Sequence, residues 1–456
     1  MKKRLLVVGL CAVLLILSQA SLAQSPEEFY RYNHSHANPD STTGAYLALI
    51  ISEKKDPGVF NLGGASYIDS LVSDYRKHML FMSDKRIKAN DHDQWKYDRI
   101  NKVLYEKVWH PIESFIGKND LVLISPDGAL NMISFAGLKD DTGKYAVEKY
   151  AIHYLSSGRD VLRFNIDTEV GKGLFALGDP DYDASVSERL ALLSKPKDVY
   201  AEAIPDASRN IRSTSKEFSN LIVCPLPWTR TEIESIVNSW KECTGEPAIS
   251  CLGVKASEER FKTESPGKRI IHLATHGYYL EHGLAGNLWE DKYNRDTVPM
   301  SEHPLLRAGL FFAGGNLHGE GADWAGIEDG ILTAYEVSAM NFTGTELVVL
   351  SACETAPGEV KCGEGVYGLR RAFQMAGARA IVSALWPISD KRTSEIMKNL
   401  YNREGRILPE QVRKLQLDLI QDLRARGEND HPFSWGDMFL IHSKLWGTLY
   451  PVIYNY

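Results

Sequence analysis

Residues 346–360 read ELVVLSACETAPGEV, and residues 269–277 read RIIHLATHG. Each stretch opens with apolar residues that do not alternate with polar ones, which is typical of a strand buried on both faces of a sheet. A third strand of this kind, AIVSALW, follows at residues 380–386. Helical patterns lie between such strands along the chain. The sequence therefore predicts an α/β fold with a parallel central sheet.

Two residues with catalytic chemistry follow neighbouring strand patterns. His276 comes directly after the strand at 269–275, and Cys353 comes after the strand at 346–351. Chemistry in parallel sheets sits at the carboxyl ends of the strands. If these two strands are adjacent, about 4.8 Å apart, the thiol and the imidazole lie within or near hydrogen-bonding reach. The positions therefore predict a cysteine–histidine dyad.

Acyl transfer requires these residue types. A thiolate is the nucleophile, and an imidazole can take the thiol proton near neutral pH and later protonate the leaving amine. The amide of Gly277 can approach a developing oxyanion closely, and the amide of Cys353 is the natural second donor. From spacing alone, the alternative is a buried structural cysteine and a structural histidine.

Longer blocks around both residues resemble a known family. HLATHG at 272–277 and LSACETAPGEV at 350–360, continuing into GEGVYGLRRAFQMAGARAIVSALWPISD at 363–390, are similar to the signature blocks of the CHAT domain. That family is a caspase-like, separase-related group of cysteine peptidases in clan CD. Similarity also extends over LYEKVWHPIESFIGKNDLVLISPDGALNMISFAGL at 104–138.

The resemblance implies a caspase-like three-layer α/β/α sandwich with a mainly parallel central sheet, preceded by a degenerate non-catalytic copy. It implies peptide-bond hydrolysis with His276 and Cys353 as catalytic residues. The oxyanion donors implied are the backbone amides of Gly277 and Cys353. We expect a protein or peptide substrate and a regulatory partner protein. The rival hypothesis is a catalytically silent scaffold or binding module of the same fold.

The loop after the nucleophile departs from the family pattern. Ala356 and Pro357 stand where the family usually has a glycine, and Cys362 is a second thiol in the same loop. Cys362 is a candidate redox partner that would form a reversible disulfide with Cys353. The alternative is that Cys362 only packs within the loop.

An acidic group near the cleft would favour a basic residue before the scissile bond. Asp390, after the strand pattern ALWPIS, is the first candidate, and Asp329 is the second. Asp329 precedes a predicted helix, ILTAYEVSAM at 331–340, so an N-cap role explains it equally well.

The predicted domain organisation has four parts. Residues 1–23 form a signal peptide, residues 24–100 a strand–helix region, residues 101–225 the non-catalytic first half, and residues 226–450 the catalytic half. The strand near Leu174 is assigned to the first half. Helices are expected at 229–240, capped by Thr229 or Thr231, and at about 365–376.

The N-terminus has the pattern of an export signal. Basic MKKR precedes an uncharged apolar run from Leu5 to Leu17 and a small-residue end at Ala23. We expect cleavage after Ala23 and a bacterial periplasmic or extracellular protein. A retained N-terminal anchor is the alternative, and no segment after residue 23 is expected to span a bilayer.

Composition limits the remaining function classes. The net charge is −7, and no Lys/Arg block interleaves with aromatic residues, so nucleic acid is not an expected partner. Five cysteines follow residue 23, and their spacings match no zinc pattern, so we expect no metal or cofactor. His272 and His276 make H-x-x-x-H, but this lies on a strand, so His272 is expected to be buried.

Overall fold

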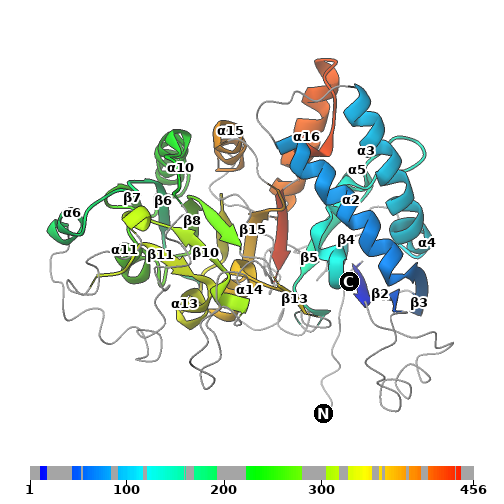
Figure 1. The fold of residues 1–456 in the computed structure, drawn as a ribbon, viewed down its shortest axis with the longest axis horizontal. Helices are drawn as coiled ribbons and strands as arrows, with labels where there is room; N and C mark the ends of the chain where they lie inside the picture. The colour runs from blue at the N-terminus through cyan, green and yellow to red at the C-terminus, as the bar shows by residue number, and fades with distance from the viewer. Residues whose placement is uncertain are drawn as a thin grey trace, which may run out of the picture. The chain divides into compact units, whose positions relative to one another are not determined.

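A computed structural model describes residues 11–17, 44–52, 55–83, 91–116, 121–158, 160, 169–192, 222–279, 304–317, 327–351, 359–361, 365–386, 390–401, 409–436 and 438–442 (Figure 1). The chain forms two compact units. The first comprises Met1–Asn165, Val360–Gly365 and Leu408–Tyr456, and the second comprises Ile166–Glu359 and Val366–Ile407. The segment from Leu408 to the C-terminus thus belongs to the first unit. The predicted boundaries instead placed residues 226–450 together in one catalytic half.

Among its described residues, the first unit has a sheet of six strands in the order β3-β2-β1-β4-β5-β16. Their bounds are β1 Cys11–Leu17, β2 Ala45–Ser52, β3 Lys55–Gly64, β4 Leu121–Ser125, β5 Ala151–Leu155 and β16 Met438–His442. β1, β4, β5 and β16 run parallel, whereas β2 is antiparallel to both β1 and β3. All five residues of β4 are buried, as its unalternating LVLIS sequence predicts.

Strand β1 falls within the predicted signal peptide. It pairs with β2 on one side and with β4 on the other. Cleavage after Ala23 would therefore remove a strand that lies between two others. The signal peptide stays a prediction, and the mass of the mature protein tests it.

Helices of the first unit follow its strands. They are α2 Ala65–Ser83, α3 Asp91–Leu104, a π-helical turn at Tyr105–Trp109, α4 His110–Glu113, α5 Ala146–Lys149 and α16 Pro409–Ala425. Short 3-10 turns lie at Gly128–Met132, Phe135–Gly137 and Pro432–Ser434. The buried Trp109 contacts the rings of Phe135 and Tyr150.

The second unit contains a sheet of five parallel strands in the order β15-β12-β8-β6-β7. Their bounds are β6 Leu174–Pro180, β7 Ala248–Gly253, β8 Ile270–Ala274, β12 Leu347–Leu350 and β15 Ala380–Ala384. The predicted parallel sheet is confirmed. The strand that begins at Leu174 pairs with β8, so its assignment to a non-catalytic first half is wrong.

Helices cover this sheet on two faces (Figure 1). Their bounds are α6 Val186–Ala191, α10 Pro227–Thr244, α11 Glu258–Glu264, α13 Ala334–Ala339, α14 Leu369–Met375 and α15 Asp390–Tyr401. α10 and α15 lie together on one face, and α11, α13 and α14 lie on the other. The rings of Phe261, Phe342 and Phe373 pack against one another in tilted and edge-to-face arrangements and are fully buried. Truncating one of them to alanine should cost about 3–5 kcal/mol of stability.

Two smaller sheets complete the described strands. β9 Gly277–Tyr279, β10 Ala308–Phe311 and β11 Ile331–Thr333 form an antiparallel sheet that begins directly after His276. β13 Glu359–Lys361 and β14 Gly365–Tyr367 form a two-stranded sheet after Cys353. Further 3-10 turns lie at Pro304–Leu306 and Gly315–Leu317.

Two predicted helix starts are wrong. α10 begins at Pro227, because proline lacks an N–H and fits the first helical position. The Thr229 hydroxyl instead donates to the Leu226 carbonyl at 2.6 Å. The expected helix from 365 starts only at Leu369, since residues 365–367 are β14 and Gly368 is extended.

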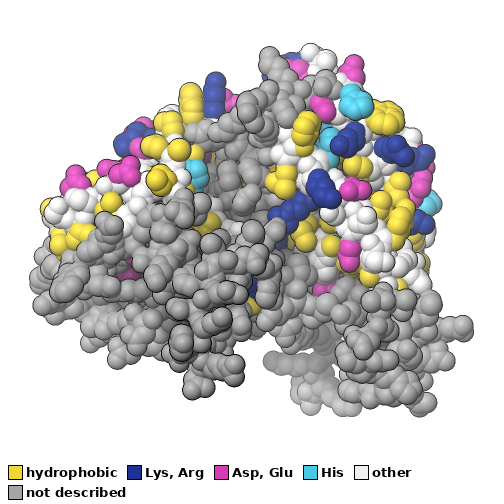
Figure 2. Space-filling view, in the orientation of Figure 1, with side chains coloured by type: hydrophobic (Ala, Val, Ile, Leu, Met, Phe, Trp, Pro, Cys, Tyr) yellow, Lys and Arg dark blue, Asp and Glu magenta, His cyan; other side chains and the backbone are white. Residues whose placement is uncertain are grey.

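The described surface mixes side-chain types. On the face shown in Figure 2, Lys and Arg side chains of the first unit lie among acidic and hydrophobic ones rather than in one basic area. Trp95 on α3 is 56% exposed and Phe81 on α2 is 49% exposed. Among the described residues, no helix is both long and apolar enough to cross a bilayer.

Candidate active site

The two central strands that precede His276 and Cys353 are paired in the sheet. β8 and β12 are parallel neighbours, and Leu350 is the Cα partner of Leu273. The amide of Ser351 donates to the Leu273 carbonyl at 2.9 Å, which extends the ladder to the strand ends. His276 stands three residues after Leu273, and Cys353 stands three residues after Leu350. The two strands are adjacent, which is the condition that the predicted dyad requires.

The imidazole of His276 is held by a backbone carbonyl. Its Nε2 lies 2.7 Å from the carbonyl oxygen of Cys224, in the segment that precedes α10. A carbonyl only accepts hydrogen bonds, so Nε2 carries the proton in this contact. The neutral ring then has its lone pair on Nδ1, the nitrogen that can take a proton from a thiol.

Backbone contacts fix the peptide of His276. Its carbonyl accepts from the amide of Phe311 in β10 at 2.9 Å. Its amide makes a longer contact, 3.4 Å, with the hydroxyl of Tyr182, which lies 3.0 Å from Thr275 Oγ1. The Thr275 hydroxyl donates in turn to the Phe311 carbonyl. The histidine is therefore anchored by β10 and by the residues after β6.

Gly277 has an amide that the adjoining ladder does not use. Its partner in the β9–β10 register is Leu310. The bond beside this pair runs from Phe311 N to the His276 carbonyl, so Gly277 and Leu310 form a non-hydrogen-bonded pair. An amide in such a position points away from the neighbouring strand. This orientation suits the predicted oxyanion role.

The other predicted site residues differ in what the structure describes. Cys353 and Cys362 lie outside the described residues. Asp390 is the first residue of α15. Asp329 is buried, and its carboxylate accepts from the amide of Ile331 at 2.9 Å. One carboxylate oxygen of Asp329 is therefore engaged by the backbone two residues further along the chain.

The helix expected after Asp329 has a different start. Residues 331–333 form β11, and α13 begins at Ala334. Its N-cap is Thr333, whose hydroxyl accepts from the amide of Glu336, while the Glu336 side chain accepts from the Thr333 amide. The predicted N-cap role of Asp329 is wrong, because this capping box satisfies the first turn.

His272 is fully buried, as predicted. Its Nε2 lies 2.7 Å from Glu232 Oε1 of α10, and its Nδ1 lies 3.1 Å from the Tyr401 hydroxyl of α15. Burial, and then the Glu232 carboxylate, raise the pKa of Tyr401 well above its usual value. The three side chains join β8 to both helices on that face. His272 is thus a structural residue of the strand that presents His276.

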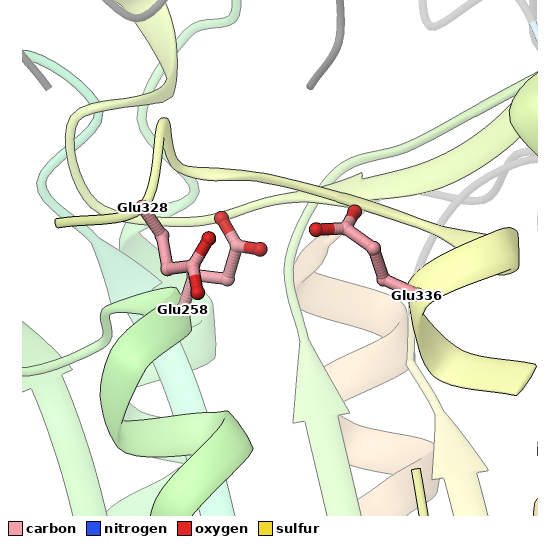
Figure 3. A group of neighbouring side chains, drawn as sticks. All are labelled: Glu258, Glu328 and Glu336. Carbon is pink, nitrogen blue, oxygen red and sulfur yellow. The ribbon is translucent and has the colours of Figure 1, made fainter. Parts of the chain in front are cut away.

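Three glutamates form an acidic cluster on the opposite face. Glu258 of α11 and Glu328 have their carboxylates side by side, and Glu336 of α13 faces them (Figure 3). The ammonium of Lys262 pairs with all three at 2.7, 3.0 and 2.9 Å. It occupies the position that a metal ion would take. We therefore assign no metal site here.

Lys262 compensates part of the negative charge of this cluster. Burial raises the pKa of Glu258 well above its usual value. Burial alone would lower the pKa of Lys262, but the surrounding carboxylates outweigh it and hold that pKa well above normal. The lysine stays charged, and the cluster ties α11 to the segment before β11.

Three cysteines outside the loop do not form disulfides. Cys224, Cys243 and Cys251 are free thiols, and only Cys251 is buried. Burial raises the pKa of Cys251 to about 12, so this thiol is unreactive.

The groups that hold His276 were not predicted from the sequence. The Cys224 contact uses a backbone oxygen, which has no residue signature. Asn316 contacts the backbone of Val223 from a Gly-Gly turn after β10. The sequence signal for Asn316 was a polar residue directly after two glycines. This pattern is common in turns, so it does not identify a contact with the site.

A match to the CHAT domain covers residues 98–443, and the chain belongs to the CHAT domain family. The caspase-like α/β fold class is confirmed with it. The family is related to the caspase-like cysteine peptidases.

A human relative and two solved structures are similar to the chain. Human tetratricopeptide repeat protein 28 is 22% identical over 360 residues, which cover 75% of this chain and 13% of that protein. The Saccharomyces cerevisiae separase–securin complex has a TM-score of 0.44 and 8% identity, covering 95% of this chain and 30% of that one. The complex of pro- and mature domains of Porphyromonas gingivalis RgpB has a TM-score of 0.37 and 9% identity, covering 83% and 75%.

Proposed function

We propose that the protein is a cysteine endopeptidase that uses His276 and Cys353. The observation that supports this most is the register of β8 and β12, in which Leu273 pairs with Leu350. His276 and Cys353 each stand three residues after a member of that pair. Membership of the CHAT family adds the relationship to caspase-like peptidases. The held imidazole of His276 adds a base with a defined proton position.

The proposed reaction proceeds through an acyl-enzyme. The Cys353 thiol gives its proton to His276 Nδ1, and the thiolate attacks the scissile carbonyl. The amides of Gly277 and Cys353 stabilise the oxyanion. The imidazolium then protonates the departing amine as the carbon–nitrogen bond breaks, leaving a thioester. Water hydrolyses the thioester, with His276 taking the water proton and returning it to the thiolate.

A peptide library tests this function. We expect purified protein to cleave peptides, and Cys353→Ala and His276→Ala each to lower kcat/KM by at least about 1000-fold. Cys243→Ala, which removes an exposed free thiol of the same unit, is the matched control. Equal cleavage by the wild type and both dyad variants would contradict the mechanism.

A basic residue before the scissile bond is the proposed specificity. Asp390 and Asp329 are the candidate pocket carboxylates. The described backbone contact of Asp329 favours Asp390. Cleavage after Arg or Lys that is lost in Asp390→Ala and kept in Asp329→Ala would support that choice, whereas unchanged preference in both variants would exclude a role for either.

Cys362 is proposed as a redox partner of Cys353. Two thiols would be oxidised to a disulfide while an external disulfide or quinone is reduced, which inactivates the enzyme until a thiol reductant restores it. Wild-type activity should then rise with reductant while Cys362→Ser activity does not. Equal reductant dependence in both proteins would argue for simple packing.

Export to the periplasm or outside the cell is proposed from the N-terminal pattern. The intact mass of protein recovered from the native host should equal that of a chain that begins at Gln24. A mass that includes the first 23 residues would show instead that β1 is retained.

A regulatory partner protein is proposed by analogy, because the separase structure contains securin. The chain spans 13% of the human relative and 30% of separase, so partners of those proteins do not transfer directly. The rival function is a silent scaffold. The presence of both His276 and Cys353 argues against it, and an active wild type in the library assay would exclude it.

A further inference from the structure

The Cys224 carbonyl that contacts His276 belongs to a segment without regular secondary structure. Ile222, which opens this segment, is 74% exposed. Within the described part of the chain, no backbone-to-backbone hydrogen bond involves residues 222–224. A carbonyl can hold an imidazole in one orientation only if its own peptide is fixed. Something other than a helix or strand must therefore hold this segment.

Asn316 hydrogen-bonds to the backbone of Val223, the residue before Cys224. Val223 N donates to Asn316 Oδ1 at 2.9 Å, and Asn316 Nδ2 donates to the Val223 carbonyl at 3.1 Å. A side-chain amide that bonds both groups of one residue copies the pairing of a neighbouring strand. The Val223 side chain also packs against a buried group that includes Tyr182 and Tyr278.

The orientation of the Asn316 amide is fixed by a carboxylate. Its Nδ2 donates to Asp183 Oδ1 at 2.9 Å. A carboxylate only accepts, so this contact distinguishes the nitrogen from the oxygen of the amide. The backbone of Asn316 is anchored too, since its amide donates to the Tyr182 carbonyl at 3.0 Å.

We propose that Asn316, oriented by Asp183, is a positioning residue for the cysteine–histidine reaction. It fixes the Val223–Cys224 segment so that the Cys224 carbonyl holds His276 with its proton on Nε2. This inference rests on the proposed function, because it assigns Nδ1 as the nitrogen that takes the thiol proton. Among the described residues its side chain contacts Val223 and Asp183, so it acts on His276 through peptide groups.

The arrangement has a chemical consequence. When His276 takes the thiol proton, the Nε2–H bond to the Cys224 carbonyl becomes charge-assisted and shortens. A ring released from this carbonyl would sample both tautomers and other rotamers. Misplacement of a catalytic group by about 1 Å can lower a rate about 100-fold.

Two measurements on purified full-length protein test the proposal. The first is kcat and KM on the best library peptide, and the second is the nitrogen-15 NMR spectrum of the His276 ring, assigned by its loss in His276→Gln. Asn316→Ala is the main variant. Asn341→Ala is the matched control, because Asn341 is exposed in the same unit and bonds only locally, to Thr343 N at 2.9 Å.

We expect Asn316→Ala to lower kcat about 100-fold with little change in KM, and to replace the single Nε2–H tautomer by a mixture. Asp183→Ala, on an exposed side chain, should lower kcat in the same direction while the protein stays folded. Asp183→Asn keeps an oxygen acceptor and should restore most of the activity. Asn341→Ala should match the wild type in both measurements.

The two failures are distinguishable. If the wild type cleaves nothing, the proposed peptidase function fails, and the ring spectrum still decides whether Asn316 sets the tautomer. If folded Asn316→Ala and Asp183→Ala retain the wild-type tautomer and kcat, the positioning role is overturned. Loss of thermal stability in Asn316→Ala with an unchanged tautomer would show a merely structural residue and would also overturn it.

Discussion

Acidification should destabilise the first unit through one histidine pair. His78 of α2 and His431 are buried, and their Nε2 atoms lie 3.2 Å apart. His431 Nδ1 accepts from the amide of Phe433 at 3.0 Å, so His431 Nε2 carries the proton and donates to His78. Burial, then the nearby His78 and Lys139, lowers the pKa of His431 to about 3.

The size of the effect follows from linkage. Between pH 6.5 and pH 3 the unfolded chain binds a proton at His431 and the folded protein does not, so stability falls as pH falls. The pKa of histidine in the unfolded chain is about 6.5. His431 alone should therefore lower the free energy of unfolding by about 2 kcal/mol between pH 7 and pH 5. The pKa of His78 is also lowered by burial, which adds loss in the same direction.

The perturbation is His431→Asn, because an asparagine oxygen can still accept from the amide of Phe433 as an N-cap. The assay is urea unfolding at pH 7 and pH 5, followed by tryptophan fluorescence. We expect the difference in unfolding free energy between the two pH values to shrink by about 2 kcal/mol in the variant. His110→Gln, on an exposed side chain of the same unit, is the control. An equal pH difference in the wild type and His431→Asn would refute this reasoning.

Three further perturbations test the second unit by urea unfolding. Glu232→Ala should cost about 3–5 kcal/mol because it removes the buried partner of His272, whereas Glu232→Gln keeps an oxygen acceptor and should cost less. Lys262→Met should cost about 3–5 kcal/mol, since it removes the buried cation that pairs with all three glutamates, and no loss would contradict a stabilising role of Lys262. Gly330 and Gly267 both have a left-handed backbone, in which alanine costs about 1–2 kcal/mol of stability. Gly330→Ala should cost more than Gly267→Ala, because only at Gly330 would the added methyl group meet backbone atoms, at 2.7 Å. Equal costs at the two glycines would contradict the described packing.

The strands around the dyad could be predicted because their sequences are unusual. VVL at 348–350 and II at 270–271 lack polar alternation, which is typical of a sheet covered on both faces. Their adjacency was only a condition of the predicted dyad, and the pairing of β8 with β12 meets it. The family resemblance supplied the same residues independently.

The small sheet β9–β10–β11 could not be predicted. Its strands have three or four residues, too few to show a period of two. The role of Cys224 had no signal, because a backbone oxygen is present in every residue. The place of β6 beside β8 depended on long-range pairing, which local sequence does not encode.

The reactivity of the Cys353 thiol tests the central claim most directly. An unassisted thiol with a pKa of about 8.5 is less than about 1% thiolate at pH 6. The rate of Cys353 alkylation by iodoacetamide at pH 6, read by peptide mass spectrometry, should be at least about 10-fold higher in the wild type than in His276→Ala. The exposed thiol of Cys243 serves as the internal reference and should react equally in both proteins. Equal alkylation of Cys353 in the two proteins would contradict a dyad of Cys353 and His276.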